Sequence, residues 1–331
     1  MRPSWDAVVA HVHVVRLPMR VRFRGVRERE VLLLRGPVGW GEFGPFVEYD
    51  DAEAARWLAG AIESAWSTAP VPVRTAVPVN ATVPAVPPDQ VPAVLAGFPG
   101  CATAKVKVGE PGQSLADDVA RVGEVRSLLG GSGRIRVDAN GAWDVRAAVD
   151  ALRALSAYGL EYAEQPCASL ADLRRLRVAL ARAGVEVAVA ADESIRKADD
   201  PLRVALSGAA DIVVLKVAPL GGVHTAMRVA ERCGLPVVVS SALDTSVGIA
   251  AGVALAAALP QLPFACGLGT AALFTRDVVT DPLVPVDGAI AVPRAARSAP
   301  DPVALEQLAA PADRQRWWRE RLARCHALLD V

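Results

Sequence analysis

The sequence lacks the features that mark several large protein classes. Its 331 residues include only five cysteines, an odd number without Cys-x-x-Cys spacing, which argues against a disulfide framework or a zinc finger and indicates a reducing compartment. The 36 basic residues are balanced by 36 acidic ones, so no excess positive charge favours binding to nucleic acid or to an anionic membrane surface. We therefore expect a cytoplasmic protein without a nucleic-acid partner.

Long apolar runs are also missing. Residues 245–275 contain no charged side chain, but the longest unbroken apolar stretch within them, 247–259, is shorter than the roughly 20 residues that a transmembrane helix needs. Asp6, His11 and His13 interrupt the first apolar stretch of the chain, so no secretory signal can be drawn there. The sequence thus predicts neither membrane insertion nor secretion.

Lysine is the scarcest charged residue. There are four lysines, Lys105, Lys107, Lys197 and Lys216, and every other basic residue is arginine. Three of them stand in strand-like apolar runs, ATAKVKV and DIVVLKV. An ammonium group can lose its proton when its pKa falls, whereas a guanidinium group cannot. Lysine in these places indicates proton transfer or Schiff-base chemistry; the alternative is a lysine that only pairs with a buried carboxylate.

The pattern of the chain changes near residue 74. Before it we expect strands at 11–16, 21–24 and 31–35 and a helix at 50–66. After it, strands alternate with helices in units of about 25 residues, which is typical of a (β/α) barrel. The eight expected strands are 77–83, 102–108, 134–138, 160–164, 186–192, 211–217, 235–240 and 264–268. The sequence therefore predicts an α/β fold: a (β/α)7β TIM-like barrel at 75–270 and an α+β capping domain at 1–74, completed by 271–331.

Polar residues stand at the carboxyl ends of five consecutive expected strands: Lys107, Asp138, Glu164, Asp192 and Lys216. The carboxyl ends of barrel strands meet at one mouth, and Lys105 shares a face with Lys107 because side chains alternate along a strand. Three converging carboxylates would repel one another without a cation, and Mg²⁺ prefers such oxygen ligands. The alternative is that each carboxylate caps the helix that follows it. The carboxylates and the lysines recur together at the ends of successive strands, which favours a magnesium site.

The motifs of this chain resemble those of the enolase superfamily. They are Lys105-Val106-Lys107, Asp138-Ala139-Asn140, Glu164-Gln165-Pro166, Asp192-Glu193-Ser194, Lys216 in LKVAPLGG, and Ser240-Ser241 ahead of Ser246-Val247-Gly248. Within the superfamily the chain resembles, over nearly its whole length, the o-succinylbenzoate synthases, dehydratases of menaquinone biosynthesis. The resemblance implies a Mg²⁺-dependent lyase that forms o-succinylbenzoate from 2-succinyl-6-hydroxy-2,4-cyclohexadiene-1-carboxylate. The N-succinylamino acid racemases share every catalytic residue and remain the alternative.

The resemblance also implies a role for each matched residue. Asp138, Glu164 and Asp192 would bind Mg²⁺, for which Mn²⁺ would substitute. Lys107 would be the acid and base, and Lys216 would face it from the opposite side. The remaining expectations are substrate contacts from Lys105, Asn140, Ser241, Gly267, Leu268 and Gly269, support behind the ligands from Arg136 and Glu193, and a mobile loop of Gly44, Pro45 and Phe46 that closes over the pocket.

Other functions would use fewer of these residues. A Schiff-base aldolase on the same barrel needs one lysine and no cluster of three carboxylates, and a non-catalytic carboxylate-binding barrel does not need paired lysines. Dipeptide epimerases carry Asp-x-Asp where this chain has Gly267-Leu268-Gly269. We expect a small carboxylate substrate as the partner; the sequence leaves the oligomeric state open.

Overall fold

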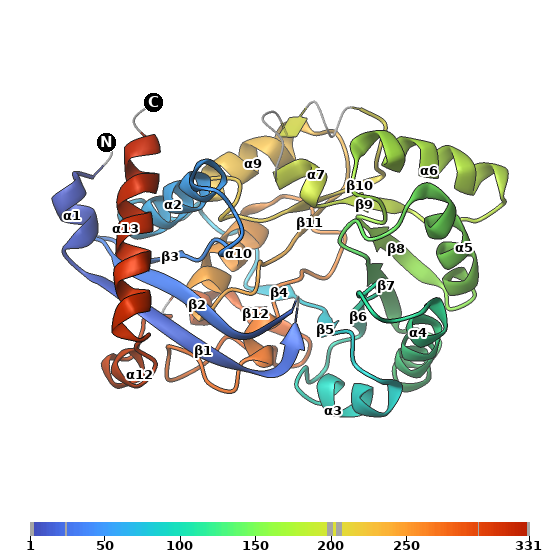
Figure 1. Cartoon of the computed structure of the whole chain (residues 1–331), viewed down its shortest axis with the longest axis horizontal. Coiled ribbons are helices and arrows are strands. Elements are labelled where there is room, and N and C mark those ends of the chain that lie inside the picture. Colours follow the sequence, from blue (N-terminus) through green and yellow to red (C-terminus); the bar gives the residue numbers. More distant parts are fainter. Residues whose placement is uncertain (1–2, 24, 197–200, 203–206, 297, 330–331) are drawn as a thin grey trace.

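The computed structural model describes residues 3–23, 25–196, 201–202, 207–296 and 298–329, and Lys197 lies outside them. Figure 1 shows a capping domain, made from the beginning of the chain in blue and its last helix in red, beside a curled sheet that is surrounded by helices. This arrangement confirms the predicted TIM-like barrel with an α+β cap.

The capping domain contains an antiparallel sheet in the order β1-β2-β3. Leu32, Leu33 and Leu34 of the middle strand are all fully buried, so both faces of that strand are covered. The helices α2 and α13 pack against the outer strands. The elements of this domain are α1 (Trp5–Val9), β1 (Val12–Phe23), β2 (Val26–Arg35), β3 (Trp40–Phe43), α2 (Asp51–Trp66), α12 (Pro302–Gln307) and α13 (Ala312–Leu328).

The first strand is longer than the sequence predicts. The two strands expected at 11–16 and 21–24 are one strand, β1, with an irregular register between Pro18 and Phe23. Pro18 cannot donate a backbone hydrogen bond, which an edge strand tolerates, and β1 is an edge strand of its sheet. The separate strand at 21–24 was therefore a wrong prediction, and the continuous strand carries Phe23 to the mouth of the barrel.

Seven parallel strands form most of the barrel wall, in the order β11-β10-β9-β8-β7-β6-β5. The segment expected as the eighth strand, 264–268, pairs only at single points: Gly267 with Ser240 beyond β11, and Cys266 with Val79 before β5. These two contacts close the barrel. The strands are β5 (Ala81–Val83), β6 (Thr103–Lys107), β7 (Arg134–Asp138), β8 (Leu160–Glu164), β9 (Val189–Ala191), β10 (Ile212–Leu215) and β11 (Val237–Val239).

The strand expected at 77–83 divides into two. Its first part, β4 (Ala76–Pro78), pairs antiparallel with β12 (Ala289–Ala291), and only β5 joins the barrel. Pro78 has no N–H to donate to a ladder, although its carbonyl accepts a hydrogen bond from Cys266 N. The chain therefore changes sheets at this proline.

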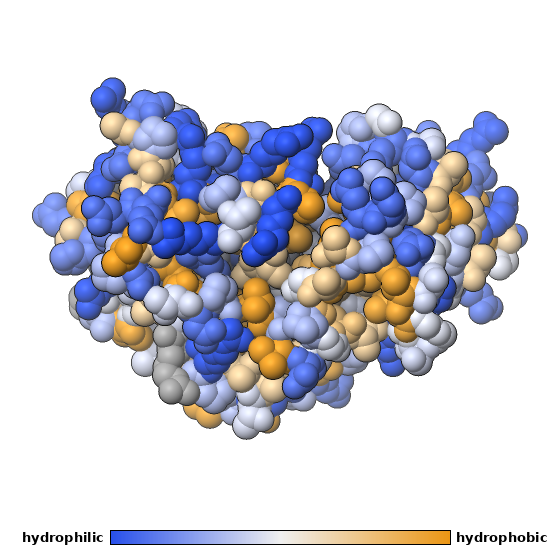
Figure 2. All heavy atoms as spheres, turned by 90° about the horizontal axis from the view of Figure 1, so that it is seen from below, coloured by the Kyte–Doolittle hydropathy of each residue, from blue (hydrophilic) through white to orange (hydrophobic). Residues whose placement is uncertain are grey.

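Helices surround the barrel, and polar side chains cap the first turns of several of them. Ser114 and Asp117 form a capping box at α4, and Asp144 and Ser169 cap α5 and α6. On the face shown in Figure 2, hydrophilic residues surround smaller hydrophobic areas. The helices of this part of the chain are α3 (Val91–Leu95), α4 (Leu115–Leu129), α5 (Val145–Ser156), α6 (Leu170–Arg182), α7 (Glu193–Arg196), α9 (Val223–Arg232), α10 (Ser246–Ala258) and α11 (Val292–Ala295), with short 3₁₀ helices at Pro88–Gln90 and Thr270–Leu273.

The uncharged stretch that begins at residue 245 forms α10, most of which is buried. None of the helices in the described ranges has the length and apolar character required to cross a membrane. Below the barrel mouth, a small apolar layer fills the interior; its members are Tyr162, Ala190, Ile212, Val214 and Val238. This layer leaves the ends of the strands as the open part of the barrel.

Glu42 joins the cap to the barrel. Its buried carboxyl group accepts hydrogen bonds from Thr245 N at 3.0 Å, from Thr245 Oγ1 at 2.6 Å and from Gly248 N at 3.2 Å, so β3 is tied to the beginning of α10. Burial, and then the charge of Asp244, raise the pKa of Glu42 to about 8. The protonated form is therefore favoured in the folded protein.

We expect the Glu42→Gln variant to lose part of the pH dependence of stability. Because its folded-state pKa is raised, Glu42 contributes stability that is fully present below its ordinary value of 4.5 and is lost as the pH rises through about 8. As the pH rises from 4.5 to about 8, the free energy of unfolding of the variant should therefore increase relative to that of the wild type, by on the order of a few kcal/mol. Urea unfolding at several pH values measures this, with exposed Glu306→Gln as the control. Parallel profiles for wild type and Glu42→Gln would contradict it.

Candidate active site

The strand register brings the acidic and basic residues together. Lys107, Asp138 and Glu164 are direct neighbours across β6, β7 and β8. Asp192 follows β9, and Lys216 follows β10. All five side chains are buried. The five residues predicted from the strand ends therefore lie at one mouth of the barrel.

Ammonium groups hold the three carboxylates. Lys105 Nζ lies 2.9 Å from Glu164 Oε1 and 3.2 Å from Asp138 Oδ2. Lys107 Nζ is 2.6 Å from Asp138 Oδ2, and Lys216 Nζ is 2.5 Å from Asp192 Oδ2. Each of the three carboxylates therefore has an ammonium partner that offsets its charge. A buried charge without such pairing would be costly.

The members of this cluster differ in acidity. Burial and the neighbouring charge of Asp138 raise the pKa of Glu164 to about 7. Burial opposes ionisation of Asp138 as well, but Lys107 and Lys105 outweigh it and hold the pKa of Asp138 well below its usual range. Burial lowers the pKa of Lys107, whereas Glu164 and Asp138 overcome burial at Lys105 and raise its pKa. Lys107 is thus the lysine that gives up its proton more easily.

The carboxylates suit a divalent cation by their chemistry. Across the described ranges, no three Asp, Glu, His or Cys side chains are grouped closely enough to hold a metal ion as they stand. However, Lys105 Nζ lies within 3.2 Å of both Asp138 and Glu164, so a positive charge already occupies the point between two neighbouring carboxylates. Asp138, Glu164 and Asp192 supply the oxygen ligands that Mg²⁺ prefers. The donor chemistry of these three carboxylates therefore fits a magnesium ion, and Lys105 marks where a positive charge is held between two of them.

A small cavity of about 30 Å³ lies over this cluster. Its walls come from the barrel and from the cap, and they comprise Phe23, Phe46, Thr82, Lys105, Lys107, Asp138, Asn140, Lys216, Ser240, Ser241, Ala242, Leu243, Gly267 and Thr270. A second cavity of about 170 Å³ shares Phe23, Lys107 and Asn140 with the first. Together the two cavities form a pocket with Lys107 at their junction.

The two catalytic lysines of the prediction lie on opposite sides of this pocket. Lys107 ends β6, Lys216 follows β10, and three strands, β7, β8 and β9, separate β6 from β10 in the sheet. In a closed barrel of this size that spacing places two strands across from each other. Lys107 Nζ also lies 5.2 Å from the centre of the Phe23 ring.

Polar residues after the strands hold the cluster in place. Asn140 accepts a hydrogen bond from Lys107 Nζ at 2.5 Å and donates one to Glu193 Oε1 at 3.1 Å. Gln165 accepts hydrogen bonds from the N–H groups of Asp192 and Ser194, so it fixes the loop that follows β9. The sequence shows Gln165 in a motif without indicating this role, because the loop that it holds is distant in the chain.

Arg136 does not have the partners that the sequence suggests. It was expected to support the ligands from behind, but its Nε donates to Glu161 Oε2 at 2.5 Å and its Nη1 donates to Ala265 O at 2.6 Å. Its guanidinium group also lies 4.8 Å from the centre of the Tyr162 ring. Arg136 therefore neutralises Glu161 below the mouth, and the lysines neutralise the carboxylates.

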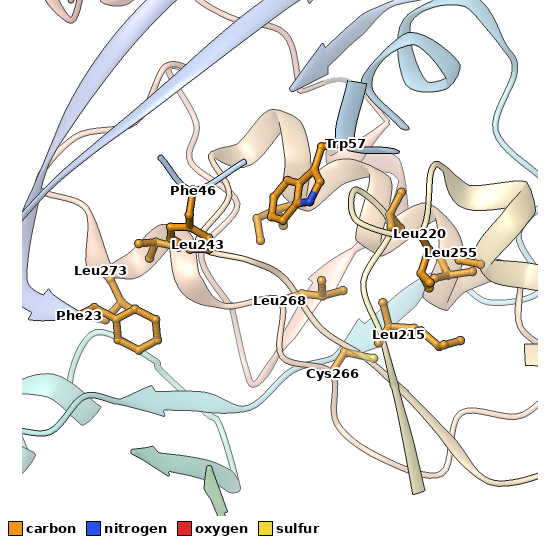
Figure 3. Packing of buried hydrophobic residues seen from close by; sticks show 14 of the residues in the cluster. Phe23, Phe46, Trp57, Leu215, Leu220, Leu243, Leu255, Cys266, Leu268 and Leu273 are labelled. Atoms are coloured by element: carbon orange, nitrogen blue, oxygen red, sulfur yellow. The ribbon is translucent and has the colours of Figure 1, made fainter. Parts of the chain in front are cut away.

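The predicted substrate contacts divide into two groups. The first group lines the cavity and includes Ser241 and Gly267. Ser241 Oγ donates a hydrogen bond to Gly267 O at 2.7 Å. Leu268 and Gly269 are not among the lining residues. The side chain of Leu268 is fully buried and packs beside Gly252 of α10. Leu268 belongs to the apolar core, as its place among the labelled side chains of Figure 3 shows.

The expected lid segment is buried, and its Phe46 lines the cavity. Gly44, Pro45 and Phe46 are all buried. Arg29 donates to Gly44 O and stacks at 4.4 Å over the Phe46 ring, and Arg321 of α13 donates to Phe46 O at 3.2 Å. Figure 3 shows Phe46 beside Leu243, which reaches the same cavity from the barrel. Two buried arginines thus hold the segment closed.

Several lining residues were not predicted from the sequence. Phe23 reaches the cavity from the cap, and Leu243 reaches it from the loop after β11. Thr82 could have been found, because it pairs with Lys105 across β5 and β6 and so shares its face of the sheet. Phe23 and Leu243 reach the site only through contacts between distant parts of the chain.

Comparisons with known proteins agree with this geometry. The family described as enolase N-terminal domain-like matches residues 14–65, and the family described as enolase C-terminal domain-like matches residues 93–296. The muconate lactonizing enzyme of Pseudomonas fluorescens aligns with a TM-score of 0.75 at 23% identity, covering 91% of this chain and 98% of that one. The L-Ala-D/L-Glu epimerase of Bacillus subtilis aligns with a TM-score of 0.70 at 22% identity, with 88% and 96% coverage. At these identities the two structures show a shared fold.

Curated relatives are much more similar in sequence. The o-succinylbenzoate synthase of Mycolicibacterium smegmatis is 58% identical over 99% of this chain and 98% of its own length. The o-succinylbenzoate synthase of Mycobacterium tuberculosis strain H37Rv is 57% identical over 99% and 97%. Since the similarity spans the cap, the barrel and the cluster at the mouth, the chain belongs to the o-succinylbenzoate synthase family of the enolase superfamily.

Proposed function

We propose that this chain removes water from 2-succinyl-6-hydroxy-2,4-cyclohexadiene-1-carboxylate to form o-succinylbenzoate, a step of menaquinone biosynthesis, in a reaction that depends on Mg²⁺. The observation that carries the proposal is the barrel mouth, where Lys107 pairs with Asp138 and two further lysines pair with Glu164 and Asp192. Removal of a proton next to a carboxylate needs a base and nearby positive charge at the same place.

Lys107 is the acid and base of this proposal. Burial lowers the pKa of its ammonium group, which favours Lys107 as the base that takes the proton from the ring carbon bearing the carboxylate. The electron pair of that C–H bond moves into the carboxylate as an enediolate, and its return expels the ring hydroxyl group. Lys107 gives the proton back to the departing oxygen, so the products are o-succinylbenzoate and water.

Asp138, Glu164 and Asp192 would hold the Mg²⁺, and Mn²⁺ would serve in its place. Bound there, the cation would stabilise the negative charge that develops on the substrate carboxylate. Lys105, which now sits between two of the ligands, would turn to the substrate carboxylate. Lys216 would stabilise the developing charge from the other side of the pocket.

The substrate would extend over both cavities. The 30 Å³ cavity above the carboxylates holds little more than a water molecule, whereas the adjoining 170 Å³ cavity, lined in part by Gln113 and Arg22, offers further room. Ser241 and Gly267, which line the first cavity, would contact the substrate over the cluster. A cytoplasmic location remains a prediction from the sequence.

Racemisation of N-succinylamino acids is the second candidate function. The opposed positions of Lys107 and Lys216 favour it, because inversion of a stereocentre needs an acid or base on each face of the substrate. Dehydration from one face needs only one such group. The two functions therefore share a site and differ in what they require of Lys216.

An absorbance assay with the cyclohexadiene substrate, beside a chiral assay with N-succinylamino acids, tests the assignment. We expect o-succinylbenzoate to form in the presence of Mg²⁺ and to stop forming in excess chelator. Racemisation without dehydration would replace the proposed function by the second candidate. Product formation at full rate in excess chelator would contradict the metal requirement.

A further inference from the structure

A buried ion pair lies beneath the strand that carries Lys107. Asp118 and Arg121 are one turn apart on α4, and Arg121 Nη1 lies 2.9 Å from Asp118 Oδ1. Their exposed fractions are 2% and 1%. Neither residue lines the cavities over the carboxylates. The sequence gives no sign of this pair, because charged residues of α4 are expected to face solvent.

The pair holds the backbone on both sides of Val108. Arg121 Nη1 donates to Lys107 O at 2.8 Å, and Asp118 Oδ2 accepts a hydrogen bond from Gly109 N at 2.9 Å. The same guanidinium group donates through Nε to Val86 O at 2.6 Å. The loop that follows β5 and the end of β6 are thus joined through one arginine.

The strand ladder cannot supply this support. Val108 N donates to Asp138 O on the β7 side, and the carbonyl of the preceding residue in an extended strand points to the opposite side, towards β5. There the pairing ends with Val83 opposite Val106, one residue before Lys107. Arg121 therefore provides the hydrogen bond that a longer β5 would have provided.

Stability alone gives a weak reason for such a pair. A buried ion pair is often no more stabilising than apolar side chains of the same volume, because both charges must leave water. Its geometric effect is stronger, since charge-assisted hydrogen bonds to a carbonyl and to an N–H fix the backbone in direction as well as in distance. A reacting group must be placed with comparable accuracy.

We propose that Asp118 and Arg121 are positioning residues for Lys107: they clamp the end of β6 so that the Lys107 ammonium group reaches the substrate in the correct position. The proposal rests on the proposed function of Lys107 as acid and base. It concerns the placement of the lysine and requires no contact between the pair and the substrate.

The chain offers a matched control on the same helix. Arg126 of α4 also binds backbone carbonyls, those of Tyr158 and Gly133, at 2.7 Å each. It does so at the end of the helix that is remote from Lys107. Replacement of either arginine by glutamine removes a charge and several carbonyl contacts, but only one of the two supports β6.

We expect Arg121→Gln to lower kcat by roughly 100-fold, the loss that a displacement of about 1 Å can cause, with little change in KM. Arg126→Gln should leave kcat within about threefold of the wild type, even where its thermal stability falls equally. Arg121→Lys, which keeps the charge and one donor, should recover part of the loss. Arg121 also donates to Gln113 Oε1, which lines the 170 Å³ cavity. Affinity for the product o-succinylbenzoate, measured by calorimetry, should therefore fall in the Arg121 variants by much less than kcat does.

A kinetic isotope effect separates positioning from general damage to the fold. With substrate deuterated at the carbon that loses its proton, Arg121→Gln should show a larger isotope effect on kcat than Arg126→Gln, because proton transfer to a displaced lysine becomes slower. If Arg121→Gln does not fold, Arg121→Lys and Asp118→Asn are measured in the same way.

Equal kcat values and equal isotope effects for the Arg121 and Arg126 variants would overturn the proposal. That result, together with an inactive Lys107→Ala variant, would leave the proposed function standing. An active Lys107→Ala variant would instead overturn the proposed function itself. The two failures are therefore distinguishable.

Discussion

Replacement of Glu164 by glutamine should reduce o-succinylbenzoate formation by at least 100-fold. Glu164 is the middle carboxylate of the predicted ligand set, lying directly across β7 and β8 from Asp138. The amide keeps the volume of the side chain but removes its charge, so both metal binding and the stabilisation of the enediolate should weaken. Lewis-acid help of this kind contributes several kcal/mol, and each 1.36 kcal/mol is a factor of about ten in rate.

Metal binding can be measured without turnover. The Mn²⁺ affinity of the apo protein, determined by titration calorimetry, should fall in Glu164→Gln and stay near the wild-type value in Glu161→Gln. Glu161 is a suitable control because it lies on the same strand but pairs with Arg136 and Arg134 below the mouth. Wild-type Mn²⁺ affinity in Glu164→Gln would remove this residue from the ligand set.

The strands that carry the site were the most predictable part of the fold. The observed bounds of β7 and β8 are those expected from the sequence, because a short apolar run between turn residues has few alternatives. The site residues follow from the same regularity: parallel strands of one barrel end at one mouth, so polar residues at successive strand ends must meet. The family resemblance then supplied their roles.

What the sequence did not predict depends on contacts between distant residues. Arg136 was expected to support the ligands from behind, but it pairs with Glu161 of the neighbouring strand. That partner becomes visible only when β7 and β8 are placed side by side. The wall at Phe46 is held by Arg321, which lies 275 positions away in the chain. The segment 264–268 has a strand-like composition, yet it pairs only at single residues, Gly267 with Ser240 after β11 and Cys266 with Val79 before β5.

The ion pair of Asp118 and Arg121 could not be predicted from the sequence for the same reason. Local pattern places Asp118 and Arg121 on a helix, where charges are usually solvated, and nothing in the sequence says that the helix turns them towards the end of β6. Glu42 and Asp244 are hidden for a related reason. Their burial at the beginning of α10 follows from the contact between cap and barrel, which no local pattern encodes.

The two lysines across the pocket should respond differently to substitution. Lys107→Ala removes the group that takes and returns the proton, so both dehydration and racemisation should fall to background. The residual cluster would also hold an Asp138 carboxylate without one of its ammonium partners. The variant should still fold, because Lys105 Nζ remains 3.2 Å from the same carboxylate.

Lys216→Arg should separate the two activities. An arginine keeps the positive charge that faces the substrate and that pairs with Asp192, but it cannot exchange a proton at neutral pH. Because elimination from one face uses only Lys107, the variant should retain measurable dehydration, reduced by roughly the 10²-fold that a displaced charge can cost. Racemisation needs an acid or base on each face, and it should disappear.

The measurement combines o-succinylbenzoate absorbance with deuterium exchange into each enantiomer of an N-succinylamino acid. For Lys216→Arg we expect exchange to persist in the enantiomer whose proton faces Lys107 and to stop in the other. Lys216→Ala is the companion variant: it removes the charge as well, so its dehydration should fall further than that of Lys216→Arg. Normal racemisation by Lys216→Arg, or dehydration by Lys107→Ala, would show that these roles are wrongly assigned, even if Asp138, Glu164 and Asp192 prove to be the metal ligands.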